Sequence, residues 1–210
     1  MAKGESVLLY GMRGKLGNLV LCYSQGKMYV RRRPRKSTKP QSLPQIVQRR
    51  RFAACVLFFR SVKAAGLEPA WEAAARGKRG SAFNLFIKAN LHNFNADGQI
   101  LDFGQLLLTP DRRTNPPCLD VVRVKSGNAN VVWRVEEEPR RGLDTDRLRA
   151  VVMGGEDSYL IGIADTGDAR RVDGSAKVRF PESGQKWQHL FLYFESEDGG
   201  VFSVAKHFIF

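Results

Sequence analysis

The sequence is poor in cysteine and has no long apolar run. Its three cysteines, Cys22, Cys55 and Cys118, are scattered and odd in number, which excludes a disulfide framework and a CxxC pair of the kind that binds zinc. We therefore expect reduced thiols, most of them buried like small apolar side chains. No apolar stretch approaches the ~20 residues that a membrane-spanning helix needs, so no transmembrane segment is predicted.

The N-terminus lacks the pattern of a secretory leader. In MAKGESVLLYG, one early lysine precedes an apolar run of only four residues, whereas the apolar core of a signal peptide is about 7–15 residues long. The expected location is therefore the cytoplasm or the interior of a phage-like particle.

Recognisable catalytic patterns are also missing. The histidines His92, His189 and His207 lie in unrelated contexts, without the HxxxH or HxE spacing of a zinc site, and there is no GxSxG elbow. The triplet DTG at residues 165–167 matches aspartic proteases over three letters only, and EEE at residues 136–138 is interpreted as a solvated strand end. We predict that the protein is not an enzyme and binds no metal or cofactor.

Acidic residues are nearly absent from the first third of the chain. Residues 1–65 contain 15 Lys and Arg against one acid, Glu5, whereas residues 95–210 contain 15 against 18. The net charge of +13 is therefore an N-terminal property. Residues 29–52 hold nine cations, three prolines and no acid. The nine cations, which form the candidate nucleic-acid-binding site, are Arg31, Arg32, Arg33, Arg35, Lys36, Lys39, Arg49, Arg50 and Arg51.

This basic stretch is predicted to contain three kinds of backbone. The run GNLVLCYSQGKMYVRRRP indicates a β-hairpin that turns at Gly26, where glycine tolerates a positive φ. Residues 34–41 are proline-bounded and are expected to be extended. A helix is then predicted to start after Ser42, with Ser42 as N-cap, Gln45 completing a capping box and Pro44 in the first turn.

The apolar residues of this first helix follow helical spacing. The predicted buried stripe consists of Phe52, Cys55, Val56, Phe59 and Val62. The three arginines at positions 49–51 lie in the N-terminal half of the helix, where cations oppose the helix dipole. Stability alone would not place them there, which favours a role for their charge.

Two further helices are predicted, at residues 69–76 and after the N-cap Ser81. The third helix presents an aromatic face made of Phe83, Phe86, Ile87, Leu91 and Phe94. We interpret this face as core. Because Lys88 and Asn90 interleave with the aromatic residues, a base-stacking platform is the alternative.

The C-terminal half has the pattern of an all-β domain. Seven short runs rich in Val and aromatic residues are separated by Gly, Asn, Asp and Pro; they are LDVVRVK, NVVWRVEE, RLRAVVM, SYLIGIA, SAKVRF, QHLFLYFE and VFSVAKHFIF. This spacing predicts an antiparallel β-sandwich of immunoglobulin-like or fibronectin-like type, with Trp133 as a core residue. The fold class is therefore α+β, with a basic hairpin and helical module at residues 1–97 and the sandwich at residues 98–210.

The order of these motifs resembles a known family. GKLGNLVLCY, GKMYVRRRP, KPQSLPQIVQRRRFAACVLFF, AWEAAARGKRGSAFNLFIKANL and LYFESEDGGVFSVAKHFIF are similar to a family of Bacteroidetes proteins defined by a domain of unknown function. The resemblance implies an N-terminal hairpin, a helical module and a C-terminal immunoglobulin-like domain. The block from residue 40 to residue 90 also resembles a helical module of phage-associated proteins. The family implies no activity.

Charge and the absence of catalytic motifs favour a binding protein. The first hypothesis is a sequence-independent nucleic-acid binder that contacts phosphates through its basic arm. The second is a structural subunit of a phage-like or cellular assembly, in which the chain forms a homo-oligomer or a larger particle. The third is a basic tether to an acidic protein or an anionic membrane. A solvated basic surface without a dedicated partner is the remaining alternative.

Overall fold

A computed structural model describes most of the chain. It covers residues 2–3, 12–24, 26–35, 40–110, 115–116, 118–125, 127–135, 144–155, 159–182 and 186–210. The chain forms two compact units, residues 1–42 and residues 43–210. All three α-helices and the seven strands of the C-terminal half belong to the second unit.

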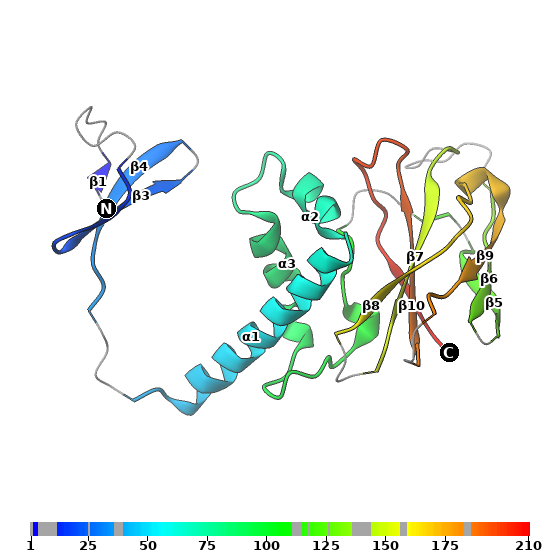
Figure 1. The fold of residues 1–210 in the computed structure, drawn as a ribbon, viewed down its shortest axis with the longest axis horizontal. Helices are drawn as coiled ribbons and strands as arrows, with labels where there is room; N and C mark the ends of the chain where they lie inside the picture. Colours follow the sequence, from blue (N-terminus) through cyan, green and yellow to red (C-terminus); the bar gives the residue numbers. More distant parts are fainter. Residues whose placement is uncertain are drawn as a thin grey trace. The chain divides into compact units, whose positions relative to one another are not determined.

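The first unit is a four-stranded antiparallel sheet. Its strands are β1 (Ala2–Lys3), β2 (Gly14–Leu16), β3 (Leu19–Ser24) and β4 (Lys27–Arg32), in the order β1-β4-β3-β2 (Figure 1). Glycine supplies a positive φ at both tight turns, +55° at Gly17 and +76° at Gly26. The predicted hairpin is confirmed as β3 and β4, and it carries a further strand on each side.

Three helices open the second unit: α1 (Leu43–Ala64), α2 (Glu68–Ala75) and α3 (Ala82–Asn90). The first begins directly after Ser42, as predicted. The backbone N–H of Asn84 donates to the Ser81 hydroxyl at 3.3 Å, which confirms Ser81 as the N-cap of α3. None of the helices in the described part of the chain is long and apolar enough to cross a membrane.

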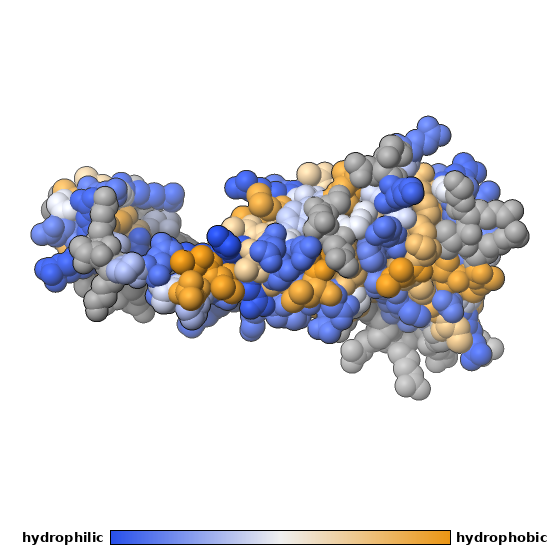
Figure 2. Space-filling model, turned by 90° about the horizontal axis from the view of Figure 1, so that it is seen from below, coloured by the Kyte–Doolittle hydropathy of each residue, from blue (hydrophilic) through white to orange (hydrophobic). Residues whose placement is uncertain are grey.

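Helix α1 is buried only in its second half. Its buried side chains are Ala54, Cys55, Phe58, Phe59 and Val62. In the first half, Leu43 is 78% exposed and Val47 is 44% exposed, and an apolar patch is visible at this end of the helix (Figure 2). The prediction of Phe52 as a core residue is wrong, because the residue is 42% exposed; its ring lies edge-to-face with Phe83, with 6.4 Å between centroids. Phe58 takes the core position instead.

The aromatic face of α3 is core, so the alternative of a base-stacking platform is wrong. Phe86 and Phe94 are fully buried. The ring of Phe86 packs against Phe59 at 4.9 Å and against Trp71 at 5.1 Å between centroids. Phe83 and Leu91 are partly buried and pack against the same core.

Each of the seven predicted C-terminal runs contains one strand. The strands are β5 (Asp120–Lys125), β6 (Asn128–Val132), β7 (Arg147–Met153), β8 (Ile161–Ala164), β9 (Ser175–Arg179), β10 (His189–Glu195) and β11 (Lys206–Ile209). They form two antiparallel sheets, β11-β10-β7-β8 and β5-β6-β9. The mixed α+β class is confirmed.

The second unit has three layers. On one face of the sheet β11-β10-β7-β8, residues such as Val151 and Phe191 pack against the helices. On the other face, residues such as Val152 and Leu190 share a core with the sheet β5-β6-β9 (Figure 1). The middle strands β7 and β10 are therefore covered on both sides. Two-sided cover explains why QHLFLYFE is a continuous apolar run instead of an alternating one.

The segment between the helices and the strands is held by buried polar side chains. Nε1 of Trp71 in α2 donates to the carbonyl of Leu108 at 2.9 Å, and the hydroxyl of Thr109 donates to the carbonyl of Ser203 at 2.7 Å. Two 3₁₀ turns also lie in it, Leu91–Asn93 and Phe103–Gln105. The domain division that we predicted between residues 97 and 98 falls inside the second unit, where residues on both sides of it line one core.

Candidate nucleic-acid interface

The sheet of the first unit has one basic face. Directly opposed residues of antiparallel strands share a face, and the register pairs Lys15 with Val20, Val20 with Arg31, and Cys22 with Tyr29. Lys27 lies on the same face because it is two residues before Tyr29. The three cations Lys15, Lys27 and Arg31 are exposed, whereas Tyr29 is half-buried. This face, called the basic face from here on, combines positive charge with one aromatic ring.

The opposite face of the same sheet is mainly apolar, with Arg32 at its edge. Leu16 pairs with Leu19, and Leu21 pairs with Val30. Leu21 is buried, while Leu16 and Leu19 are 59% and 45% exposed. The alternation of charged and apolar residues along β4 therefore separates them onto two sides of the sheet.

The predicted arm residues are exposed where the structure describes them. Arg31 and Arg32 end β4 on opposite faces of the sheet, and Arg33 and Arg35 follow it. All four side chains are exposed. Two further predicted residues, Lys36 and Lys39, lie outside the described residues. These four arginines are thus available to a ligand.

The three arginines at positions 49–51 have different environments. Arg49 and Arg50 are exposed on α1. Arg51 is only partly exposed: its Nε donates to the carbonyl of Phe94 at 2.7 Å, and its Nη2 donates to the carbonyl of His92 at 3.2 Å. Arg51 therefore fixes the start of α1 to the turn after α3. Its placement in the N-terminal half of the helix has a structural reason that the dipole argument missed.

Four basic residues of the first unit were not among the predicted site: Lys3, Arg13, Lys15 and Lys27. Arg13, Lys15 and Lys27 are all exposed, and the guanidinium of Arg13 lies 5.2 Å from the ring centre of Tyr23. A local count of charge overlooks them because they are spread thinly along residues 3–27, in β1, just before and within β2, and at the start of β4. The useful signal was the alternation of Lys27, Tyr29 and Arg31 along one strand.

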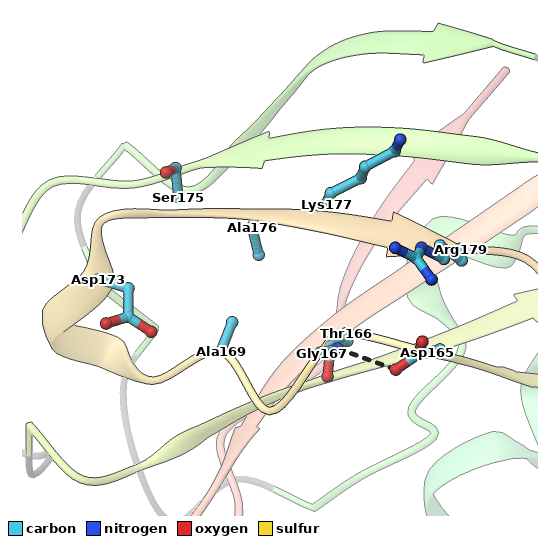
Figure 3. A pocket seen from close by; sticks show the side chains of 9 residues that line it. All are labelled: Asp165, Thr166, Gly167, Ala169, Asp173, Ser175, Ala176, Lys177 and Arg179. Atoms are coloured by element: carbon cyan, nitrogen blue, oxygen red, sulfur yellow. Dashed lines mark hydrogen bonds between the residues drawn. The ribbon is translucent and has the colours of Figure 1, made fainter.

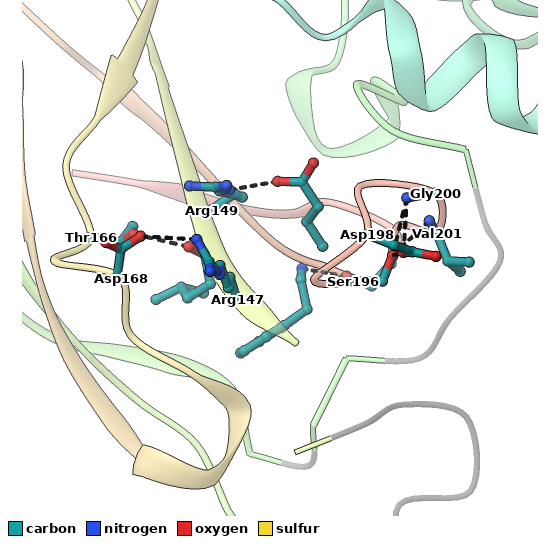
Figure 4. A network of polar contacts seen from close by, with 12 residues as sticks. Arg147, Arg149, Thr166, Asp168, Ser196, Asp198, Gly200 and Val201 are labelled. Atoms are coloured by element: carbon teal, nitrogen blue, oxygen red, sulfur yellow. Dashed lines mark hydrogen bonds and ion pairs between the residues drawn. The ribbon is translucent and has the colours of Figure 1, made fainter. Parts of the chain in front are cut away.

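The cations of the first unit differ from the arginines of the sandwich in their partners. In the sandwich, Arg149 donates to Glu195 at 2.6 Å and Arg147 lies 3.6 Å from Asp168 (Figure 4). Residues 1–42 contain ten Lys and Arg but only Glu5 as an acid, and no described cation of this unit forms an ion pair with another described residue. Positive charge is internally compensated in the sandwich and uncompensated in the first unit.

A shallow pocket lies at one end of the sandwich, between the turn after β8 and strand β9. Asp165, Asp173, Lys177 and Arg179 contribute its charged groups (Figure 3). The carboxylate of Asp165 accepts from the backbone N–H of Gly167 at 2.9 Å, so the DTG triplet forms a turn. The two carboxylates of this lining, Asp165 and Asp173, lie at opposite ends of the pocket (Figure 3) and not side by side as in an aspartic-protease pair.

The possible metal ligands and the three cysteines are the other candidate groups. The described residues hold no cluster of three His, Cys, Asp or Glu side chains able to bind a metal ion. The thiols are free: Cys55 is buried, Cys22 is half-buried and Cys118 is exposed, so the prediction of mostly buried thiols is correct for Cys55 alone. Burial raises the pKa of Cys55 to about 12, which keeps it a neutral thiol.

A comparison with protein-family models matches residues 11–208 to DUF6266, a family of unknown function. The chain belongs to this family. The DUF6266 match covers residues 11–42 of the first unit and extends through the second unit to Phe208 in β11. No curated protein and no solved structure matches the chain.

The DUF6266 region also contains every cation of the first unit whose side chain the structure describes. Arg13 lies just before β2, and Lys15 lies within that strand. Lys27 and Arg31 lie in β4, and Arg35 follows it. All five residues are between residues 11 and 208. The basic sheet and the sandwich are therefore parts of one family architecture.

Proposed function

We propose that the protein is a non-enzymatic nucleic-acid-binding protein whose N-terminal unit contacts phosphates. The observation that carries the proposal is the set of exposed cations without acidic partners in this unit; the described members are Arg13, Lys15, Lys27, Arg31, Arg32, Arg33 and Arg35. Arg49 and Arg50, exposed at the start of α1, add to them. Uncompensated charge of this density attracts a polyanion.

The proposed interaction depends on the charge of the phosphates and discriminates little between nucleotide sequences. Phosphate contacts fix the position of a protein on nucleic acid but do not distinguish bases. Arginine supplies most of these cations and matches phosphate with two parallel N–H donors. Each phosphate neutralised contributes roughly 0.7 to 0.9 to the slope of log affinity against log salt. Binding is therefore expected to weaken steeply as salt rises.

The C-terminal domain is proposed to be an immunoglobulin- or fibronectin-like sandwich. If β5 to β11 are lettered A to G, the pairings A–B, B–E, C–F and F–G occur here, and these are also pairings of the immunoglobulin constant type. The fourth strand pairs with C instead of E. Such domains carry binding loops at their ends, which suits a module displayed beside a nucleic-acid-binding unit.

A second candidate function is a structural subunit of an assembly. It is favoured by apolar surface: Leu16 and Leu19 in the first unit are exposed, and so are Leu43 and Val47 at the start of α1. Surfaces of this kind mark contacts with protein partners. The resemblance to Bacteroidetes proteins and to a phage-associated module agrees with such a subunit, located in the cytoplasm or inside a particle.

A charge-matched binding experiment tests the first candidate. The triple variant Arg31→Gln/Arg33→Gln/Arg35→Gln removes three exposed arginines of the first unit, and Arg134→Gln/Lys177→Gln/Lys186→Gln removes three exposed cations of the sandwich. Affinity for labelled oligonucleotides, single-stranded and duplex, is measured by fluorescence anisotropy from about 50 mM salt upward. The first variant is expected to bind more weakly, with a salt slope shallower by about one unit per lost contact.

The control variant carries the same change in net charge and is expected to bind like the original protein. Equal losses in both variants would mean that only net charge matters, and no binding at about 50 mM salt would refute the proposal. Binding to anionic vesicles but not to oligonucleotides would favour the membrane tether. Light scattering that shows a large closed oligomer would favour the structural subunit.

A further inference from the structure

The basic face holds an aromatic ring at its centre. Tyr29 lies on β4, one of the two inner strands of the sheet β1-β4-β3-β2. Lys27 and Arg31 lie two residues before and after it on the same face, and Lys15 reaches this face from β2 through the pairing with Val20. Tyr29 is therefore flanked by Lys27 and Arg31 along β4, and Lys15 lies on the same face two strands away.

The spacing of these residues suits a flexible chain of phosphates and bases. Side chains on one face of a strand are separated by roughly 7 Å for every two residues. Lys27, Tyr29 and Arg31 thus form a row in which an aromatic ring alternates with cations. A single strand of nucleic acid presents alternating charged and flat groups along its length, and aromatic residues in basic grooves bind such strands by stacking.

The accessibility of the bases determines whether Tyr29 can stack on a single strand or on a duplex. The bases of a duplex stack on each other, so a ring on a sheet surface reaches a base only where the strands are separated. Tyr29 is half-buried as a residue, and its ring forms no ring contact with another described aromatic residue. The guanidinium of Arg13 lies over Tyr23 on the apolar face. Tyr29 is thus partly open to solvent, and no described aromatic ring competes with a base for its face.

We propose that the basic face binds single-stranded nucleic acid, with Tyr29 stacking on an unpaired base while Lys15, Lys27 and Arg31 contact the flanking phosphates. This inference rests on the proposed function and narrows its ligand to strands with exposed bases. Stacking is tolerant of sequence because every base has an aromatic face. The preference is therefore for single strands over duplexes, without a preference for a particular sequence.

The test compares single strands with duplexes in the full chain. The probes are labelled oligo(dT) and oligo(rU) of about 20 nucleotides and a duplex of the same length, at about 50 mM salt. Single strands are expected to bind more tightly than the duplex. Tyr29→Leu is expected to weaken single-strand binding by roughly 5- to 150-fold, the range measured for one stacked base, whereas Tyr29→Phe keeps the ring and the affinity.

Two controls separate stacking from misfolding. Tyr23→Leu removes a ring from the apolar face of the same sheet and is expected to leave single-strand affinity unchanged. The duplex affinity of Tyr29→Leu is also expected to be unchanged, because the cations remain. As a measurement that needs no variant, photocrosslinking to a 5-bromouridine oligonucleotide is expected to label the tryptic peptide of residues 28–31, which contains Tyr29.

The possible failures are distinguishable. If neither single strands nor duplex bind, both the proposed function and this inference are wrong. If the duplex binds at least as tightly as the single strands, or if Tyr29→Leu binds oligo(dT) and oligo(rU) like the original protein, the stacking role is refuted while nucleic-acid binding stands. A difference between oligo(dT) and oligo(rU) assigns the ligand to DNA or RNA and supports the inference in either case.

Discussion

Nδ1 of His189 lies 3.0 Å from Nε2 of His207, so the two imidazoles form a hydrogen bond between the neighbouring strands β10 and β11. The ring of Phe103 stacks on His189 with 3.6 Å between centroids. We predicted unrelated contexts for the histidines, and the structure instead brings two of them together. Since one nitrogen must donate and the other accept, the contact is incompatible with two protonated rings.

We predict that this pair makes the protein less stable in mild acid. Burial and the neighbouring His207 lower the pKa of His189 to about 4, and burial also lowers the pKa of His207 despite the nearby Asp102. Below the ordinary value near 6.5, the unfolded chain binds protons that the folded chain does not. The free energy of unfolding is expected to fall as pH drops from about 6.5 towards 4.

Urea unfolding at several pH values measures this loss. Each histidine is expected to contribute up to about 1.4 kcal/mol per pH unit. The double variant His189→Gln/His207→Gln should therefore show a shallower decline over the same range. An unchanged slope would assign the acid sensitivity to carboxylates elsewhere.

Replacement of Arg51 should reduce stability, unlike replacement of its neighbours. Arg51→Gln loses two hydrogen bonds to backbone carbonyls of Phe94 and His92, and charged hydrogen bonds are each worth about 1.5–3 kcal/mol. Because Arg51 is partly exposed, we expect a total loss of about 2 kcal/mol. Arg49→Gln and Arg50→Gln change exposed side chains, and each is expected to stay within about 0.5 kcal/mol of the original protein in urea unfolding.

The buried ion pair of Arg171 and Asp146 is expected to be sensitive to loss of one partner. Nε of Arg171 lies 3.7 Å from Oδ2 of Asp146, with the side chains 2% and 0% exposed. Asp146→Asn removes a negative charge beside a buried cation, and breaking a buried ion pair in this way costs about 3–5 kcal/mol. The exposed pair of Lys63 and Glu68, 2.8 Å apart, is the control: Lys63→Gln should cost no more than about 1 kcal/mol. Equal effects of the two changes would argue against a dry site around Arg171.

A methyl group at position 162 should strain the sandwich. A Cβ on Gly162 would lie 2.8 Å from Cγ of Pro181 and from Cη2 of Trp187, both parts of rigid rings. Gly162→Ala is expected to destabilise the fold by about 1–3 kcal/mol through overpacking. Gly200→Ala, whose Cβ would be no closer than 3.4 Å to a neighbour, should have a much smaller effect in thermal unfolding.

Local patterns were sufficient to predict most of the elements, but not strands β1 and β2. The helix start after Ser42, the cap at Ser81 and all seven C-terminal strands follow from capping residues, apolar periodicity and turn residues that act within a few positions. The wrong prediction for Phe52 shows what local patterns cannot predict. Helical spacing defines a stripe, but the orientation of the stripe depends on which residues the other helices cover, and this is a property of the packed structure.

Long-range pairing was not predictable from local pattern, and the candidate site depends on it. Lys15 and Arg31 are far apart in sequence and share a face only because each pairs with Val20. The contact of His189 with His207 likewise requires β10 and β11 to be neighbours. The charge density along the chain was enough to identify the basic arm. The basic face could be recognised only once the register of the sheet was known.

The double cover of β10 has a consequence for how this architecture changes over evolutionary time. Neighbouring residues on this strand, such as Phe191 and Leu192, belong to different cores, so an insertion or deletion of one residue would disturb the helices and the sandwich together. Recombination that exchanges the helices alone would also have to replace the alternate side chains of β10 that pack against them. A crossover near Ser42, where the two compact units meet in sequence, disrupts neither core, and this is where we expect natural chimaeras of the family to be joined.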